Sequence, residues 1–433
     1  MRYMLVITDG EAVLNGADAA DGHDLFDALD GAETPALDAM GRLGRVGVAA
    51  TSPSGVCSFA HGVLSLLGYG PESIASLSPA VIDAAATGEE LGDGDWVVRM
   101  GLVSVSDEDG EGLMHGYGSA SEPASGPASD DETRAVFDDL IAHWRETDGA
   151  RTERVKIVGT GSERLLIDRD HAAQGPGYAG VEMVDPGSIV GERWVEHLPD
   201  GGAPKGPAAF LCGLISESRH FLAEHPVNAA RREQGLGTVN LAWAWDAGCA
   251  GGLGALPPRV RTGAGVEASA AGGVSIVTDC ERGVGLARLI GCPHTLVTDP
   301  GGLLDAVGPG VGETGSGEGG VGLVVVLTDR GIEAVDREVV GPLLALLSGR
   351  ATGELEDVDG ALWRVLVAVS HDPVGASGIG GGMSPFVLAG GRVRSVVDRR
   401  LSGAMGSDLR VDPASELLEY VLNAGLRGMD RGW

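Results

Sequence analysis

The sequence predicts an α/β protein in which a core built on a parallel sheet carries a smaller inserted α+β domain. Short β-branched runs such as Tyr3–Thr8 and Leu323–Asp329 lack strict alternation, as strands buried on both faces of a parallel sheet do. In the second half of the chain such runs alternate with helical periodicity, which is typical of right-handed β-α-β crossovers. We therefore expect a core in two parts, 1–105 and 201–433, with an inserted domain at 106–200.

Hydrophobic patterning locates the individual elements. The expected strands are Tyr3–Thr8, Val46–Ala50, Trp96–Val105, Val155–Gly159, Val239–Trp245, Val274–Asp279, Thr295–Asp299, Leu323–Asp329, Arg364–Ser370 and Pro385–Ala389. The expected helices are Ala36–Leu43, Asp131–Thr147, Pro207–Glu224, Glu281–Ile290, Ile332–Leu347 and Ala414–Leu426. Thr34-Pro35 reads as a helix cap followed by proline at the first helical position. Residues 106–130, rich in Ser, Gly, Asp and Glu, are expected to be a loop.

Charge and hydropathy exclude several classes of partner. The 433 residues include 31 basic and 62 acidic side chains, so the net charge is −31. Such a chain repels nucleic acid and anionic lipid unless it has a basic patch, and the sequence contains no basic run. No stretch approaches the roughly 20 apolar residues of a membrane helix, and the apolar run within Met1–Gly10 is too short for a signal peptide. We expect a soluble, cytoplasmic protein with no nucleic-acid or membrane partner. The sequence does not indicate which oligomeric state the protein has.

The five cysteines are dispersed and form no C-x-x-C pair. An odd, scattered set in a cytoplasmic protein is typical of reduced, buried thiols rather than of a zinc ribbon or a disulfide scaffold.

Several expected strands end in the same polar way. Thr8-Asp9, Thr278-Asp279, Thr298-Asp299 and Thr328-Asp329 each close an apolar run, and a fifth run ends Ser370-His371-Asp372. In a parallel sheet the residues after the carboxyl ends of strands meet at one edge, where oxygen and imidazole donors could hold a divalent cation. The alternative is structural: Asp279 caps the next helix, Asp299 begins a Pro-Gly-Gly turn, and Asp329 is followed by Arg330-Gly331.

Longer motifs carry a family resemblance. Asp9-Gly10, TPALDAMGRLGRVG (Thr34–Gly47), LSLLGYGP (Leu64–Pro71) and WVVRMGLVSV (Trp96–Val105) resemble the archaeal-type cofactor-independent phosphoglycerate mutases. So do HPVNAARREQGLGTVNLAWAWDAG (His225–Gly248), DCERGVG (Asp279–Gly285), IEAVDREVVGPLL (Ile332–Leu344) and SPFVLAGG (Ser384–Gly391), which bring the resemblance to most of the chain outside the insert. The resemblance implies an alkaline-phosphatase-like core with an inserted substrate-covering domain.

The same resemblance implies a reaction. The family moves a phosphoryl group between the 2- and 3-hydroxyls of glycerate through a phosphoserine, with two divalent ions activating the serine. Its seven ligands are an Asp after the first strand, the Ser, a D-x-x-x-H pair, a D-H dipeptide and a later His. The metal would be manganese, magnesium or zinc.

This chain matches only part of that ligand set. Asp9 matches directly, and Ser58 is the counterpart of the nucleophile after a one-residue shift. Asp329 supplies one carboxylate, but Arg330-Gly331 follows it and no histidine does. Ser370-His371 replaces the D-H dipeptide, so His371 remains. The later histidine aligns with Ile379. With Ser58 counted as unmatched because of its shift, four of the seven ligands are unmatched, and Asp279, Asp299 or Asp372 would have to compensate; a protein without metal is the other outcome.

On the substrate side the resemblance places Arg99, Arg231 and Arg232 near an anionic ligand, here a small phosphorylated metabolite. His225 and Asn228 lie in the HPVN turn, and Asn240 begins a strand. For the turn the structural alternative is an Asn or His that caps a loop, and for Arg99 it is a surface salt bridge.

Three functions stay open from the sequence. The first is a phosphoglycerate mutase, with activity impaired or lost because of the unmatched ligands. The second is a non-catalytic relative that serves as a binding or regulatory protein. The third is a phosphotransferase that acts on another phosphorylated metabolite.

Overall fold

The computed structural model divides the chain into two compact units. One unit comprises Met1–Ala75 and Leu253–Trp433, and the other comprises Ser76–Gly252. The structure describes residues 2–10, 12–13, 25–51, 59–74, 77–106, 112–117, 128–147, 155–160, 163–169, 177–201, 206–249, 251, 253, 274–298, 302–303, 305–307, 323–347, 355–356, 362–370, 382–391, 393, 399–407 and 409–423. We call the units the core unit and the inserted unit.

The core unit is built on a mostly parallel sheet. Five neighbouring strands run parallel in the order β12-β1-β10-β8-β9, β13 joins β12 antiparallel, and β2 and β14 extend the sheet beyond it. The strands are β1 (Arg2–Asp9), β2 (Arg45–Ala50), β8 (Val274–Thr278), β9 (His294–Leu296), β10 (Leu323–Thr328), β11 (Leu355–Glu356), β12 (Leu362–Ser370), β13 (Met383–Gly390) and β14 (Arg410–Val411). The predicted α/β class is confirmed.

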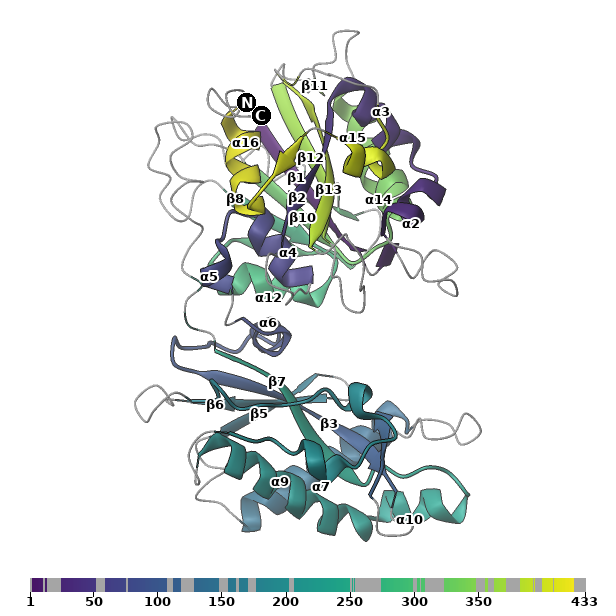
Figure 1. Cartoon of the computed structure of the whole chain (residues 1–433), viewed down its shortest axis with the longest axis vertical. Helices are drawn as coiled ribbons and strands as arrows, with labels where there is room; N and C mark the ends of the chain where they lie inside the picture. The colour runs from purple at the N-terminus through teal and green to yellow at the C-terminus, as the bar shows by residue number, and fades with distance from the viewer. Residues whose placement is uncertain are drawn as a thin grey trace. The chain divides into compact units, whose positions relative to one another are not determined.

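Helices flank this sheet (Figure 1). They are α2 (Leu25–Gly31), α3 (Pro35–Leu43), α4 (Phe59–Leu66), α5 (Pro71–Ile74), α12 (Glu281–Leu289), α14 (Ile332–Val335), the π-helical turn η6 (Asp336–Val340), α15 (Gly341–Leu347), η7 (Leu401–Gly406), η8 (Ala414–Glu416) and α16 (Leu417–Asn423). Residues 332–347, expected as one helix, therefore contain a π-helical turn.

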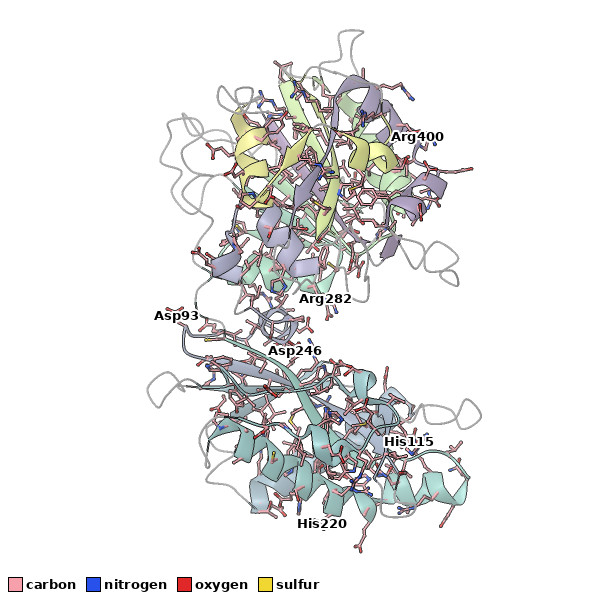
Figure 2. All side chains as sticks on the ribbon, viewed as in Figure 1. Asp93, His115, His220, Asp246, Arg282 and Arg400 are labelled. Atoms are coloured by element: carbon pink, nitrogen blue, oxygen red, sulfur yellow. The ribbon has the colours of Figure 1, made fainter. Side chains whose placement is uncertain are left out.

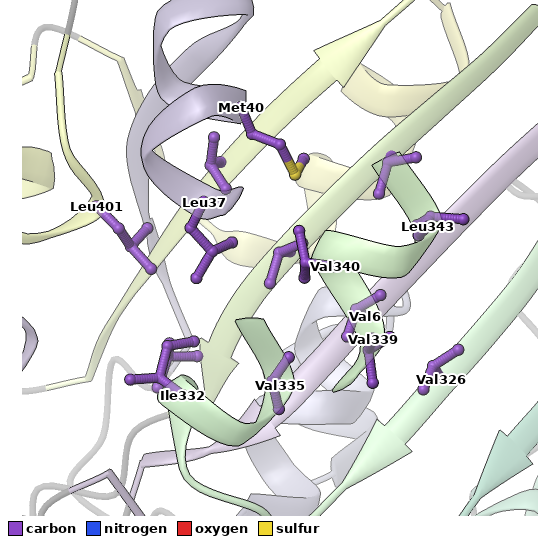
Figure 3. Close-up of a cluster of buried hydrophobic side chains, with 14 of the residues drawn as sticks. Val6, Leu37, Met40, Val326, Ile332, Val335, Val339, Val340, Leu343 and Leu401 are labelled. Atoms are coloured by element: carbon purple, nitrogen blue, oxygen red, sulfur yellow. The ribbon is translucent and has the colours of Figure 1, made fainter. Parts of the chain in front are cut away.

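Alternate strand residues build the main core beneath α3 and α14–α15. Val6 and Val326 point from β1 and β10 toward Leu37 and Val340 (Figure 3). These residues are fully buried. A strand that is covered on both faces must be apolar at successive positions. The continuous apolar runs in the sequence follow from this packing.

The start of α3 is held differently from what the sequence predicts. Thr34 is the N-cap residue and Pro35 follows it, but the Thr34 side chain makes no capping bond. The Asp336 carboxylate accepts from the backbone N–H groups of Ala36 (3.2 Å) and Leu37 (2.7 Å) instead. A carboxylate from a distant helix thus satisfies the free donors at the start of α3.

The inserted unit has a five-stranded antiparallel sheet of order β4-β3-β6-β5, with β7 on β3. Its strands are β3 (Trp96–Val105), β4 (Met114–Tyr117), β5 (Val155–Thr160), β6 (Glu163–Asp168) and β7 (Leu241–Cys249). Its helices are α6 (Pro79–Ala86), α7 (Asp130–Thr147), η4 (Pro186–Ile189), η5 (Trp194–His197), α9 (Pro207–Ala223) and α10 (Pro226–Glu233). Phe137, Trp144 and Trp243 belong to its core.

The boundaries of this unit differ from the expected 106–200. Both β3 and β7 had been expected in the core, yet they pair with each other along Trp96–Val103 and Leu241–Cys249. The unit therefore extends from residue 76 to residue 252. The strands themselves were located by their apolar runs, but those runs do not say which sheet a strand joins.

None of the helices in the described part of the chain is long and apolar enough to cross a membrane.

Candidate functional site

Four adjacent strands of the core unit bring their polar ends to one edge of the sheet. Thr8 of β1 is in register with Thr328 of β10, Leu327 with Thr278 of β8, and Asp9 with Ser370 of β12. The predicted meeting of the strand ends is thus confirmed for these four strands. Asp299, His371 and Asp372 lie outside the described residues, as does the expected nucleophile Ser58.

The hydroxyl groups at this edge hold the loops that follow the strands. Thr8, Thr278, Thr328 and Ser370 are fully buried. Thr8 donates to the carbonyl of Arg330, and Ser370 donates to the carbonyl of Phe59 at 3.0 Å. The Thr278 hydroxyl accepts from the N–H of Cys280 at 3.2 Å. These bonds fix the loop after β10 and the start of α4, which directly follows Ser58.

Asp279 and Arg330 form the charged centre of the edge. Arg330 Nε lies 2.5 Å from Asp279 Oδ2, and the Thr328 hydroxyl donates to the same oxygen at 3.0 Å. Arg330 Nη1 lies 2.6 Å from Glu338 Oε2. The Asp279 side chain is 5% exposed, so this ion pair is largely removed from water.

The pairing fixes the charge states of the cation and one of its partners. Partial burial opposes the charged form of Arg330, but the bonds to Asp279 and Glu338 raise the pKa of its guanidinium above the ordinary value. Hydrogen bonds from Arg337 and then Arg330 hold the pKa of Glu338 below its ordinary value. The edge therefore has a permanent guanidinium charge between two carboxylates.

Asp279 is not the helix cap that the sequence suggested as one alternative. Cys280 occupies the N-cap position of α12 and makes no side-chain capping bond. Asp279 turns toward Arg330 instead, and its Oδ1 is buried with no hydrogen-bond partner among the described residues. Asp329, in contrast, is exposed.

The described strand ends do not fit the D-x-x-x-H half of a two-cation site. After Asp329 the chain passes through Arg330 and Gly331, and α14 begins at Ile332, which leaves no loop for a histidine ligand. The Arg330 guanidinium already lies beside the buried Asp279 carboxylate, and its positive charge disfavours a divalent ion there. No group of three His, Cys, Asp or Glu with metal-binding geometry occurs within the described ranges. Asp9 is buried at the end of β1, beside Ser370.

The inserted unit places Arg99 among three carboxylates. Its guanidinium contacts Asp83 (2.5 Å), Glu163 and Asp246 (3.3 Å), and the residue is 8% exposed. Burial opposes its charged form, but these partners raise the pKa of Arg99 above its ordinary value. Its charge is thus balanced within the protein by a buried cluster of ion pairs, and not by the surface salt bridge that the structural alternative expected.

Asp246, which is labelled in Figure 2, has an unusual backbone conformation and contacts Arg99. Among the described residues other than glycine, Asp246 has a positive φ, of 51°. It lies in β7 at the point where the pairing with β3 skips one residue. Bulges re-aim side chains, and here the Asp246 carboxylate reaches both Arg99 and the N–H of Ala80 at the start of α6. Burial raises the pKa of Asp246, and Arg99 partly offsets that rise.

The HPVN turn supports the polypeptide around it. His225 caps α10, with Nδ1 accepting from the N–H of Val227 and Nε2 3.1 Å from Asp139. The Asn228 amide donates to the carbonyls of Leu222 (2.9 Å) and Val239 (2.8 Å).

Arg231 and Asn240 also bond within the inserted unit. Arg231 bonds the Gly237 carbonyl and Glu132, and Asn240 bonds the backbone N–H and carbonyl of Val105. These contacts hold neighbouring parts of the inserted unit together; a role in substrate binding stays a prediction.

The core unit of this chain is a mostly parallel sheet with polar strand ends at one edge. The α+β inserted unit lies between its two parts in the sequence. Comparison with known proteins relates this chain to one enzyme family. The family model described as 2,3-bisphosphoglycerate-independent phosphoglycerate mutase matches residues 41–228. The predicted resemblance is therefore confirmed, over a region that includes most of the inserted unit.

Curated relatives match a stretch of similar length. The 2,3-bisphosphoglycerate-independent phosphoglycerate mutase of Methanosarcina acetivorans is 30% identical over 187 residues, which are 43% of this chain and 41% of that protein. A probable enzyme of the same name from Geobacter sulfurreducens is 31% identical over 187 residues, with the same coverage. The match thus spans about two fifths of the length of these relatives.

Solved structures resemble the whole chain in fold. The PH0037 protein of Pyrococcus horikoshii gives a TM-score of 0.60 at 17% identity, covering 100% of this chain and 98% of that one. The cofactor-independent phosphoglycerate mutase of Thermoplasma acidophilum gives 0.53 at 17% identity, covering 98% and 100%. At this identity the likeness establishes the fold alone.

Arg330 is the site residue that sequence reasoning missed. In the sequence Arg330 is only the residue that follows Asp329. Its pairing with Asp279, 51 positions away, depends on β8 and β10 being neighbours. The available signal was a basic residue directly after one of several Thr-Asp strand ends, where the resemblance implied a ligand loop.

Proposed function

We propose that this chain is a phosphoglycerate mutase-like protein in which the interconversion of 2- and 3-phosphoglycerate is impaired or lost. The observation that carries the proposal is that Arg330, just beyond the end of β10, forms ion pairs with both Asp279 and Glu338. The Arg330 guanidinium lies after β10, and α14 begins at Ile332. The family's loop with a histidine ligand would be needed at this position.

The energetic argument concerns the serine. A hydroxyl attacks a phosphate ester at a useful rate only when a base or metal activates it and positive charge stabilises the phosphoryl group in transfer. An arginine that is already paired with two carboxylates offers little of that charge to a substrate. Ser58 would therefore be a weak nucleophile, and the protein would act as a cytoplasmic binding or regulatory protein for a small phosphorylated metabolite.

A rearranged phosphotransferase is the second candidate, and the buried Oδ1 of Asp279 favours it. This oxygen has no hydrogen-bond partner in the described part of the chain, and an unsatisfied buried carboxylate oxygen is a donor that a cation could use. Such an enzyme would act as a glycolytic isomerase, or as a phosphotransferase on another phosphorylated metabolite, with a manganese, magnesium or zinc ion at a changed position.

The test is a coupled assay of 3-phosphoglycerate turnover by the full chain, with and without added manganese. We expect no turnover above the background of a mock preparation. The variants are Ser58→Ala and, as a matched control from the same segment, Ser54→Ala. Turnover that requires manganese and disappears in Ser58→Ala but not in Ser54→Ala would refute the proposal and establish the enzyme.

A further inference from the structure

The inserted unit contains a pocket that the proposed function does not use. Its volume is about 470 Å³, which is within the range of small-molecule sites. It lies between α7 and the hairpin of β5 and β6, and the described lining residues all belong to the inserted unit. The lining consists of Arg134, Asp138, Ile141, Arg145, Ile157, Gly159 and Arg164.

The spacing of the α7 residues explains one wall. Arg134, Asp138, Ile141 and Arg145 follow one another at intervals of four, three and four, so they share one face of the helix. The two arginines stand at the ends of this row. Eleven residues of helix span about 16 Å, so the row offers positive charge at two separated points.

The opposite wall is the hairpin, where a glycine leaves the space open. β5 is the edge strand of the sheet, and its Gly159 is in register with Arg164 of β6. A Cβ atom at residue 159 would lie 3.4 Å from the Arg164 guanidinium. A larger side chain there would therefore cover this guanidinium.

Arg164 is fixed in position. Its side chain is 7% exposed, and its guanidinium lies 5.0 Å above the ring of Phe137. Nη1 donates to the Glu163 carbonyl at 2.9 Å, and Nη2 lies 3.3 Å from Asp138, a carboxylate that is 65% exposed. A guanidinium held by packing loses little entropy when it binds an anion, whereas its exposed carboxylate partner is a weak competitor.

The two arginines of α7 are less committed. Arg134 pairs with Asp131, but both side chains are largely exposed, and such pairs contribute little. Arg145 is exposed and makes no ion pair within the described residues. Among the described residues, the lining thus has three guanidinium groups against one carboxylate, in a chain whose net charge is −31.

We propose that this pocket binds a small multivalent oxyanion. Guanidinium groups recognise phosphate and carboxylate oxygens through paired hydrogen bonds, and a local positive potential in an acidic protein selects anions. The separation of Arg134 and Arg145 favours a ligand with negative charge at more than one point. Ile141 and Ile157 give the ligand an apolar surface between the charges.

Isothermal titration calorimetry of the full chain, in low-salt buffer with EDTA, tests the proposal. The probes are inorganic pyrophosphate and citrate, which separate a phosphate ligand from a polycarboxylate. We expect saturable binding of at least one probe, and the tighter of the two identifies the source. Arg145→Gln should weaken binding about tenfold, since it removes one charged hydrogen-bonding group.

Two further variants complete the experiment. Asp138→Asn removes the only carboxylate from the described lining and should tighten binding about threefold. Arg193→Gln, on the exposed 3-10 segment of the same unit, should leave binding unchanged. The proposal is overturned if neither probe binds saturably. It is equally overturned if Arg145→Gln has no effect, or if Arg193→Gln weakens binding as much.

Discussion

Replacing Arg99 by Met should destabilise the inserted unit strongly. The change leaves Asp83, Glu163 and Asp246 close together, with side-chain exposures of 17%, 30% and 19%, and no cation between them. Breaking a buried ion pair costs about 3–5 kcal/mol, and the partial exposure of the three carboxylates favours the lower end. We expect a loss of about 3 kcal/mol in the free energy of unfolding.

The loss should depend on pH. Burial already raises the pKa of Asp246, and removing Arg99 removes the charge that lowers it, so this pKa rises further. A carboxyl with a raised pKa in the folded state favours folding when it is protonated, and that contribution is lost as the pH rises through the folded pKa. The variant should therefore approach the wild-type stability as the pH falls toward the unfolded pKa of about 4.

Urea unfolding followed by tryptophan fluorescence measures this effect. Five of the seven tryptophans lie in the inserted unit, so the signal reports mainly on it. The double variant Arg99→Met/Asp246→Asn should recover part of the loss, because asparagine tolerates positive φ and still accepts from Ala80. Arg193→Met is the exposed control. A loss below about 1 kcal/mol, or a loss equal at pH 7 and pH 4.5, would refute the electrostatic account of this cluster.

Three further changes test particular contacts by urea unfolding; for those in the core unit, far-UV circular dichroism replaces tryptophan fluorescence, which reports mainly on the inserted unit. Arg330→Gln should cost about 2 kcal/mol, because it leaves the buried Asp279 carboxylate without its cation; no loss would contradict the ion pair. Asn228→Ala should cost about 2–4 kcal/mol, since the carbonyls of Leu222 and Val239 lose their donor. Weaker ligand binding without a loss of stability would instead indicate a substrate-binding residue. Asp336→Ala should cost about 1–2 kcal/mol by uncapping α3, while Thr34→Ala should change stability little; the opposite order would contradict the observed cap.

The strand ends were predictable because parallel strands share a direction. The apolar runs locate β1, β8, β10 and β12, and the polar residue pairs that close them meet at one edge once the strands are neighbours. What each side chain contacts there could not be predicted. Arg330 bonds Asp279 across two strands, and no local pattern encodes that contact.

The membership of β3 and β7 was missed for a similar reason. Their apolar residues mark them as strands, but pairing between segments about 140 positions apart is a tertiary choice that local propensity does not determine. The same holds for the arginine-lined pocket. The spacing of Arg134 and Arg145 is visible in the sequence, whereas the register of Gly159 and Arg164 across the β5–β6 hairpin completes the pocket.

The central claim is that the two-cation serine centre is incomplete in this chain. Metal analysis of the purified full chain after equilibration with manganese and exhaustive dialysis tests it most directly. We predict less than one tightly held ion per chain, with no difference between the wild type and Ser58→Ala. Two tightly bound ions per chain, at least one of them lost on Ser58→Ala, would contradict the claim.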